Sequence, residues 1–418
     1  MTGHTELAKR FGTPSYVYDL DRVAAAKRDL FAALPDEVDV FYAVKANPHP
    51  EIVREMGVAQ ERGGARRRGC RAEISSVGEL TAVLDAGLDA AEVLYTGPGK
   101  TDEEIAEALA RGVRLFSVES LGDLRHIGAV GVRLGVVADC LLRVNSVSAS
   151  ASTSIRMTGV PSQFGFDSET LPALRDELTG VPGTTVAGLH FFPLSNSADE
   201  PSLIAEFQHT IALAAQLQDE LGVAFRFVDI GGGFAAPYAV IGERPVYGAL
   251  RAALAESLDT HFPGWRDGGP RIACESGRYL VADSGTLLVG VVNLKESRGR
   301  RFVILDGGIN SFGGMSGLGR ILPVSVRPYE TGAPHEQLAS LVGPLCTPGD
   351  ILGRDIELPA LAPGDTVAIP NAGSYGVTAS LLMFLGRPAP AEIVVRGPEV
   401  VSASRIQHTR DYELGRGL

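Results

Sequence analysis

The residues best placed for chemistry stand where short apolar runs end. Lys45 closes VDVFYAVK (38–45), Arg143 ends LLRVN, His190 lies in GLHFFPLSNS and Glu275 lies in CESGR. A lysine that is desolvated at such a position can lose its proton and condense with an aldehyde. Taken singly, Lys45 is as readily a solvent-facing lysine at the start of a loop, and the other three are more often structural.

A glycine triplet gives a second chemical signal. Gly231, Gly232 and Gly233 follow an apolar run in VDIGGGF (228–234). Consecutive glycines expose backbone N–H groups that can hold a phosphate. A tight turn is the alternative, and the sequence has no GxGxxG or P-loop motif that would indicate a nucleotide. A lysine, a phosphate-type loop and an acidic residue together are what a pyridine aldehyde phosphate requires.

Alternating strands and helices are predicted to position these residues. β-rich runs occur at 38–45, 72–76, 92–97, 114–120, 140–145, 185–192, 225–232 and 271–278. Segments with apolar residues at helical spacing lie between them, as at 78–88, 102–112 and 202–222. This pattern predicts an α/β fold that closes as a (β/α)8 barrel rather than as an open doubly wound sheet. In such barrels the active site gathers at the carboxyl ends of the strands.

The pattern of predicted secondary structure changes after residue 278. Successive strands without long helices are predicted at 286–297, 300–308, 336–346, 365–373 and 391–397. The early segment SYVYDL (15–20) also has strand character and is expected to pair with them. We therefore predict two domains, a barrel over 26–280 and a β domain formed by 1–25 and 281–418.

Composition narrows the classes of partner. The 418 residues are 45% hydrophobic and carry a formal charge of −12, which disfavours nucleic acid or an anionic membrane as the main partner. The start of the chain lacks a signal-peptide pattern, and no uninterrupted apolar run reaches about 18 residues, so we expect a cytoplasmic protein. Its four cysteines form no CxxC pair, and neither a metal site nor a disulfide framework is expected.

Ten motifs resemble one family of enzymes along almost the whole chain. They are FYAVKANP (41–48), EISSVGEL (73–80), LRVN (142–145), SQFGFD (162–167), GLHFFPLSNS (188–197), VDIGGGF (228–234), CESGRYLVADSG (274–285), LDGGIN (305–310), GPLCTPGD (343–350) and NAGSYGVTAS (371–380). In this order they resemble the fold-type III decarboxylases that use pyridoxal 5'-phosphate (PLP), the family of diaminopimelate, ornithine and arginine decarboxylases. The resemblance implies an alanine racemase-like barrel followed by a β domain.

The resemblance also implies roles for individual residues. Lys45 would hold PLP as a Schiff base, and Glu275 would pair with the pyridine nitrogen and keep it protonated, which makes the ring a better electron sink. His190 and Phe192 would lie beside the cofactor. The residues expected around its phosphate are Ser195, Gly231, Gly232, Gly233, Arg278 and Tyr375.

Cys346 matches a cysteine that reaches the cofactor from the partner subunit and returns a proton to the substrate carbon. This match implies a homodimer with shared active sites. A buried structural thiol is the alternative. Arg143, Thr347 and Asp350 are assigned to the substrate side of the site.

The sequence departs from the usual family pattern at several positions. Phe192 stands where a second histidine usually stacks on the pyridine ring, and Pro193 and Leu194 replace small residues before Ser195. Thr347 stands where the enzymes that grip a distal amino group have an acidic residue. GPLCTPGD (343–350), together with LDGGINSFGGMSGLGRILPV (305–324) and FLGRPAPAEIVV (384–395), is similar to a biosynthetic branch that includes decarboxylases of amino acids tethered to a carrier protein.

A basic segment, RGGARRRGCR (62–71), lies between the first two predicted barrel strands. In an acidic protein it forms a local positive patch that could steer the docking of an acidic acyl carrier protein. A solvated or disordered loop is the plainer alternative.

The predicted function is PLP-dependent α-decarboxylation of a carrier-tethered or modified acidic amino acid. Decarboxylation of free diaminopimelate, lysine or ornithine is an alternative, and racemisation is another on the same fold. A noncatalytic PLP-binding protein is the alternative from a different class; the β domain and Cys346 argue against it.

Overall fold

The computed structural model describes residues 3–62, 65–67, 69–146, 162–192, 196–313, 327–328 and 337–410, and only the backbone of 60–62, 65–67 and 327–328. The chain divides into two compact units. A barrel unit comprises Val23–Ala236 and Arg244–Leu280. A β unit comprises Met1–Arg22, Pro237–Glu243 and Val281–Leu418. The loop 237–243, which follows the glycine triplet, thus belongs to the β unit.

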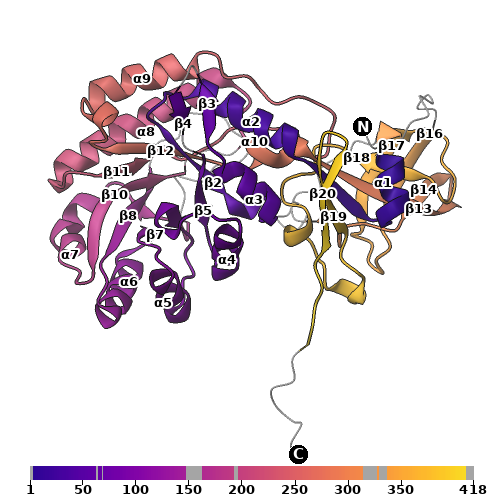
Figure 1. The fold of residues 1–418 in the computed structure, drawn as a ribbon, viewed down its shortest axis with the longest axis horizontal. Coiled ribbons are helices and arrows are strands. Elements are labelled where there is room, and N and C mark those ends of the chain that lie inside the picture. The colour runs from indigo at the N-terminus through magenta and orange to yellow at the C-terminus, as the bar shows by residue number, and fades with distance from the viewer. Residues whose placement is uncertain are drawn as a thin grey trace, which may run out of the picture. The chain divides into compact units, whose positions relative to one another are not determined.

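Parallel strands close the barrel unit, as predicted (Figure 1). In order around the barrel they are β2 (Asp39–Ala43), β5 (Arg71–Ile74), β6 (Val93–Tyr95), β7 (Leu115–Val118), β8 (Ala138–Asn145), β10 (Thr184–Phe191), β11 (Phe227–Asp229) and β12 (Arg271–Ser276). The pairing of β12 with β2 completes the ring. A two-residue strand, β9 (Phe166–Asp167), pairs with the end of β8. Each of the eight predicted runs overlaps one of the ring strands.

Buried side chains explain why these short segments are strands. Their interior layer consists of Phe41, Leu94, Leu115, Leu141, Ala187, Phe227 and Ala273. Each of these comes from a different strand of the ring, so the barrel is filled by side chains rather than open along its axis.

Helices connect the strands and surround them (Figure 1). They are α2 (Leu20–Ala33), α3 (Pro50–Gly57), α4 (Val77–Asp85), α5 (Asp102–Ala110), α6 (Leu121–Leu134), α7 (Arg175–Thr179), α8 (Glu200–Leu221) and α9 (Leu250–His261). Side chains of Ser76, Thr101, Ser120 and Asp199 accept backbone N–H groups at the starts of α4, α5, α6 and α8. These caps fix the points at which the chain turns from the site into a helix.

The basic segment 62–71 contains a hairpin. Strand β3 (Gln60–Arg62) pairs antiparallel with β4 (Ala65–Arg67). This hairpin follows α3 and precedes β5, so the connectivity places it at the amino-terminal end of the barrel strands. Lys45 follows the carboxyl end of β2, at the opposite end of the barrel.

The β unit is built on a mixed sheet with the order β17-β16-β14-β13-β1-β19-β20. Its strands are β1 (Ser15–Asp19), β13 (Gly285–Ser297), β14 (Arg300–Leu305), β15 (Arg327–Pro328), β16 (Gln337–Val342), β17 (Ile351–Leu358), β18 (Thr366–Ile369), β19 (Ala391–Arg396) and β20 (Glu399–Arg405). The predicted pairing of the early strand is confirmed, since β1 lies antiparallel to β13 and parallel to β19. Helix α1 (His4–Phe11) contributes Leu7 and Ala8 to the core of this unit.

Two long strands of the β unit, β17 and β20, were not predicted. Strand β20 is largely exposed, and β17 mixes buried and exposed residues without strict alternation. The sequences ILGRDIEL of β17 and EVVSASR of β20 do not alternate apolar and polar residues, which is the pattern by which a half-buried strand is recognised. Within the described part of the chain, no helix combines the length and apolar character that a membrane crossing requires.

Candidate active site

Charged and polar side chains converge at the carboxyl ends of the barrel strands. Lys45 lies in a single turn, η1 (Val44–Ala46), directly after β2. A cavity of about 400 Å³ opens at this end. Its lining includes Lys45, Glu73, Arg143, His190, Phe192 and Glu275. The four residues with which the sequence argument began therefore line one cavity.

Lys45 is held by an ion pair at the edge of this cavity. Its Nζ lies 2.9 and 2.8 Å from the two carboxylate oxygens of Glu73. The Glu73 side chain is only 2% exposed, whereas that of Lys45 is 41% exposed. Thr96 Oγ1 donates to Glu73 at 2.5 Å, so the carboxylate is fixed from behind. The amine is thereby positioned, yet it stays accessible to a molecule in the cavity.

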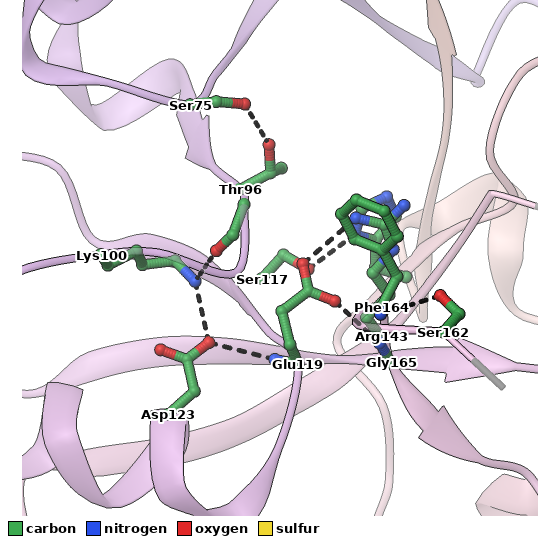
Figure 2. A network of polar contacts seen from close by, with 12 residues as sticks. Ser75, Thr96, Lys100, Ser117, Glu119, Asp123, Arg143, Ser162, Phe164 and Gly165 are labelled. Carbon is green, nitrogen blue, oxygen red and sulfur yellow. Dashed lines mark hydrogen bonds and ion pairs between the residues drawn. The ribbon is translucent and has the colours of Figure 1, made fainter. Parts of the chain in front are cut away.

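Arg143 lies in β8 and is fixed by charge and by aromatic rings. Its Nη1 lies 3.1 Å from Glu119 Oε1, and the Gly165 N–H donates to Glu119 Oε2 at 2.9 Å (Figure 2). The guanidinium is 4.7 Å from the centroid of the Phe164 ring and 5.9 Å from that of Phe192. Glu119 therefore connects the arginine to the segment that carries Phe164.

A buried lysine extends the same network away from Lys45. Lys100 Nζ donates to Asp123 Oδ2 at 2.8 Å and to the Gly97 carbonyl at 2.6 Å (Figure 2). The same Asp123 oxygen accepts the Glu119 N–H at 3.0 Å. The Lys100 side chain is 1% exposed. Its amine is thus held in a structural ion pair, and Lys45 is the better-placed amine for chemistry.

A histidine and two carboxylates form the buried floor of the site. Ser117 Oγ lies 2.7 Å from His190 Nδ1, and His190 Nε2 lies 3.0 Å from Glu275 Oε1. The second contact is close but is not aligned as a hydrogen bond. His190, Asp229 and Glu275 have ligand atoms within 4.8 Å of one another. This set comes from three adjacent strands, β10, β11 and β12.

The two carboxyl groups differ in their pKa. Burial, followed by the charge of Glu275, raises the pKa of Asp229 well above its usual range. Burial also opposes ionisation of Glu275, but attraction to His190, Lys45 and Arg143 outweighs it and holds the pKa of Glu275 below its usual value. Two neighbouring acids whose pKa values are pushed apart are typical of a functional site.

The glycine triplet permits a close approach of the backbone. A Cβ atom on Gly232 would lie 2.4 Å from the Glu275 carbonyl oxygen, and Gly231 has a φ of +79°. Both positions therefore require glycine. The Gly231 N–H donates to Asp229 Oδ1 at 2.9 Å. Of the three glycine N–H groups, that of Gly231 is therefore already bonded inside the barrel and does not face a phosphate.

Several predicted site residues lie in the β unit. Cys346 is exposed, whereas burial raises the pKa of the thiols of Cys70, Cys140 and Cys274. Thr347 lies beside Cys346 and accepts the Gly349 N–H.

Asp350 and Tyr375 have defined contacts inside the β unit. Asp350 is buried and its carboxylate accepts the N–H groups of Ile309 and Leu345, each at 2.7 Å. Those bonds give Asp350 a structural task, and its substrate role stays a prediction. Tyr375 has a φ of +52°, and its carbonyl accepts the Tyr238 hydroxyl at 3.3 Å. Arg278 begins a short helix, α10 (Arg278–Val281), in the barrel unit, and Ser195 lies outside the described residues.

Sequence reasoning missed four residues of the site. Glu73, Ser117, Glu119 and Asp229 each stand within the last two residues of a barrel strand or directly after one. That position was the available signal, because polar residues there face the mouth of a barrel. Their partners could not be predicted, since each contact joins segments far apart in the chain.

The polar atoms of the barrel site fit a pyridine cofactor, whether or not the family resemblance is considered. His190 Nε2, Glu275 Oε1 and Asp229 Oδ2 are buried and have no hydrogen-bond partner among the described residues. Such groups usually find a partner, and a protonated ring nitrogen in the cavity would supply one. The donor set could also hold a divalent cation, but the accessible amine of Lys45 favours an aldehyde cofactor.

Comparisons with known proteins agree with this chemistry. Residues 20–282 match the family model described as pyridoxal-dependent decarboxylase, pyridoxal binding domain. The chain is 32% identical to an L-glutamyl-(BtrI acyl-carrier protein) decarboxylase from Niallia circulans, over 94% of this chain and 91% of that protein. It is 31% identical to a diaminopimelate decarboxylase from Pseudomonas aeruginosa, over 99% and 95% of the two chains.

A solved structure shows the same architecture. The crystal structure of diaminopimelate decarboxylase from Helicobacter pylori complexed with L-lysine matches with a TM-score of 0.80 and 26% identity, over 95% of each chain. The chain therefore belongs to the family of pyridoxal-dependent decarboxylases and is a PLP-dependent amino acid decarboxylase.

Proposed function

We propose that the substrate is an acidic amino acid carried as a thioester on an acyl carrier protein, and that it loses its α-carboxyl group. The observation that carries this proposal is Thr347, a neutral residue directly after Cys346, where a distal ammonium would need an acid. The glutamyl carrier-protein decarboxylase of Niallia circulans, 32% identical to this chain, supports the same substrate class.

In this proposal residues of the barrel hold the cofactor around the cavity. Lys45 would hold the cofactor through its aldehyde, Glu275 would pair with its ring nitrogen, and Phe192 would lie beside its ring. Ser195, Gly232, Gly233 and Arg278 would hold the phosphate, together with Tyr375, which belongs to the β unit. Bound PLP supplies an electron sink for the bond between the α-carbon and the carboxylate.

The protein's own groups then orient the substrate and move protons. Glu73 is the base closest to the Lys45 amine, at 2.8 Å, and takes up its proton when the amine reacts. Arg143 is held by Glu119 and faces the cavity, where its remaining N–H groups can bind an oxygen of the substrate. Cys346 donates a proton to the α-carbon after the carboxyl group leaves.

We further propose a homodimer in which the β unit of one subunit supplies Cys346 to the site of the other. The exposed position of Cys346 supports this, because a thiol that serves another subunit must be accessible. The enzyme would act in the cytoplasm, in a biosynthetic pathway of secondary metabolism.

The position of the β3–β4 hairpin argues against a role for the basic segment 62–71 in steering the carrier protein. Its strands β3 and β4 lie at the amino-terminal end of the barrel. A carrier bound there would be at the opposite end from Lys45 of the same subunit. We therefore retain the proposal of a carrier-linked substrate and expect this substrate to enter the site from the carboxyl-terminal end of the barrel.

A competition assay tests the substrate class. The enzyme is given carrier-linked glutamate or aspartate together with free glutamate, aspartate, lysine, ornithine or diaminopimelate, and the amine products are quantified. Carrier-linked forms should dominate, because a buried ammonium without a partner typically costs ~3–5 kcal/mol, or several hundredfold in affinity. Efficient turnover of a free basic amino acid would contradict the proposal.

Two sets of variants serve as matched controls. Thr347→Asp restores an acid beside Cys346 and should improve turnover of free lysine or diaminopimelate, whereas Thr347→Val should not. Changing Arg66, Arg67 and Arg68 to alanine should leave kcat/KM for the carrier-linked substrate unchanged. A large loss in the arginine variant would restore the docking role of the hairpin without altering the substrate class.

A further inference from the structure

Asp229 is the most enclosed acid of the site, and the chemistry above gives it no task. It is 0% exposed, and its neighbours His190 and Glu275 are 1% and 3% exposed. Asp229 pairs in register with His190 of β10. One oxygen, Oδ1, accepts the Gly231 N–H, whereas Oδ2 is buried without a partner among the described residues.

The surroundings of Asp229 disfavour a second negative charge. Glu275 and Glu73 are the acids that act on it, the Cys274 thiol lies nearby, and the Gly231 N–H and the Arg143 charge oppose them. His190 also faces it, within 4.8 Å. Two buried carboxylates a few ångströms apart cannot both ionise at low cost. The pair is therefore more stable with one proton. Glu275 is the better anion of the two, because its Oε1 lies 3.0 Å from His190 Nε2 and the charges of Lys45 and Arg143 also act on it.

We infer that Asp229 is a protonated positioning residue, which donates its proton to Glu275 and, with His190, fixes that carboxylate as the anion facing the cofactor's ring nitrogen. This rests on the proposed role of Glu275. The raised pKa of Asp229 and the lowered pKa of Glu275 agree with the geometry.

The hydrogen-bond donors and acceptors around the Glu275 carboxylate explain why it needs these neighbours. An ionised carboxylate only accepts hydrogen bonds, so every group that faces it must bring a proton. His190 Nε2 can supply one proton and Asp229 Oδ2 another. Glu275 then keeps a lone pair for the ring nitrogen, while its charge remains stabilised in a dry interior.

Ser117 completes the arrangement from β7. Its hydroxyl, 2.7 Å from His190 Nδ1, can donate to a neutral imidazole or accept from a charged one. In both states the other ring nitrogen keeps its proton toward Glu275. Ser117 is thus a positioning residue that acts through His190.

Infrared difference spectroscopy of the holoenzyme tests the proton on Asp229 directly. Wild-type protein minus Asp229→Asn at neutral pH should show the carbonyl stretch of a protonated carboxylic acid. Asp123→Asn is the matched control, because Asp123 is paired with Lys100 at 2.8 Å and should show the loss of an ionised carboxylate instead. A carboxylate signal for Asp229 would overturn the inference.

Cofactor binding provides the second readout. Asp229→Asn keeps a neutral side chain with a donor and should bind PLP within about threefold of wild type. Asp229→Ala and His190→Ala should weaken binding about tenfold or more and shift the pH dependence of the bound cofactor's absorption, since each removes a charge-assisted bond. Ser117→Ala should give a smaller shift of the same sign.

The outcomes separate this inference from the proposed function. Glu275→Gln should weaken PLP binding most and abolish the absorption of the protonated ring. If Glu275→Gln leaves the absorption unchanged, the proposed role of Glu275 is wrong. If Glu275→Gln behaves as expected but Asp229→Asn weakens PLP binding equally, only the inference about Asp229 is wrong.

Discussion

Both ends of the barrel carry clustered charged side chains, and the two clusters differ in whether each group has a partner. At the amino-terminal end Asp39 Oδ2 lies 3.4 Å from Arg71 and 2.5 Å from Arg271, and Arg71 also pairs with Glu92 at 2.9 Å. The Arg71 guanidinium lies 5.1 Å from the centroid of the Phe41 ring. Each charge in this group has an opposite charge as its partner.

The carboxyl-terminal end leaves buried groups incomplete. His190 Nε2, Asp229 Oδ2 and Glu275 Oε1 lack partners among the described residues, and His190 and Glu275 line the cavity beside Lys45. A satisfied buried network contributes to stability, whereas an unsatisfied one beside a cavity indicates a ligand. Changes at the two ends should therefore affect different measurements.

The largest expected effect is on catalysis at the carboxyl-terminal end. Lys45→Ala should lower kcat/KM by ~10³-fold or more, because the residue that binds the cofactor covalently is lost. Release of carbon dioxide measures the rate. Borohydride reduction of wild-type protein followed by peptide mapping should place the cofactor on Lys45; a label on Lys100 or Lys295 would contradict the site.

The next effect is on stability at the amino-terminal end. Asp39→Ala leaves the buried Arg71 and the half-buried Arg271 without their shared acid and should reduce the free energy of unfolding by about 1–3 kcal/mol. The exposed Arg266, paired with Asp259 at 2.9 Å, is the control, and Arg266→Ala should cost less than about 1 kcal/mol. Denaturant unfolding measures both. A loss of kcat in folded Asp39→Ala protein would contradict the expectation that changes at the amino-terminal end affect stability and not catalysis.

A smaller effect is expected at the edge of the cavity. Glu119→Gln keeps an amide oxygen for the Gly165 N–H but removes the charge that holds Arg143. The change should raise KM for the carrier-linked substrate about tenfold, because a hydrogen bond to a charged group contributes ~1.5–3 kcal/mol. Steady-state kinetics measure this, and an unchanged KM would remove Arg143 from the substrate side of the site.

The smallest expected effect concerns a buried acid outside the cavity. It tests whether a buried group that lacks a hydrogen-bond partner is by itself a sign of function. Glu206 in α8 is 1% exposed and has no partner for either oxygen among the described residues, and burial raises its pKa to about 7. It does not line the cavity that contains Lys45. Because the folded state holds this proton more tightly than the unfolded state, stability should fall as pH rises from ~4.3 to about 7.

Glu206→Gln should weaken that dependence, while Glu392, whose pKa burial also raises to about 7, retains its own contribution; kcat/KM should be unchanged. Unfolding curves of the two proteins at several pH values between 4 and 8 give the comparison. Reduced activity in Glu206→Gln would show that an incomplete buried acid can matter to the reaction without facing the cavity.

The barrel could be predicted from sequence because its strands are short, apolar and separated by capped helices. Lys45, Arg143, His190 and Glu275 were recognisable, since each ends such a run. The pairing of Lys45 with Glu73, or of Arg143 with Glu119, was not, because these contacts depend on which strands become neighbours around the ring. Strand β20 escaped prediction for a different reason, since its exposed edge carries no apolar repeat.

The position of β1 has a consequence for synthesis on the ribosome. Tyr16 lies opposite Glu392 of β19, so the first strand made must wait for one of the last before its sheet is complete. The barrel strands end at Ser276 and can assemble earlier, because domains generally fold as units in the order of synthesis. β1 exposes two pairing edges until β13 emerges and one edge until β19 emerges, and unpaired edges promote aggregation. Nascent chains stalled after residue 290 should accordingly depend more on chaperones than the finished protein does.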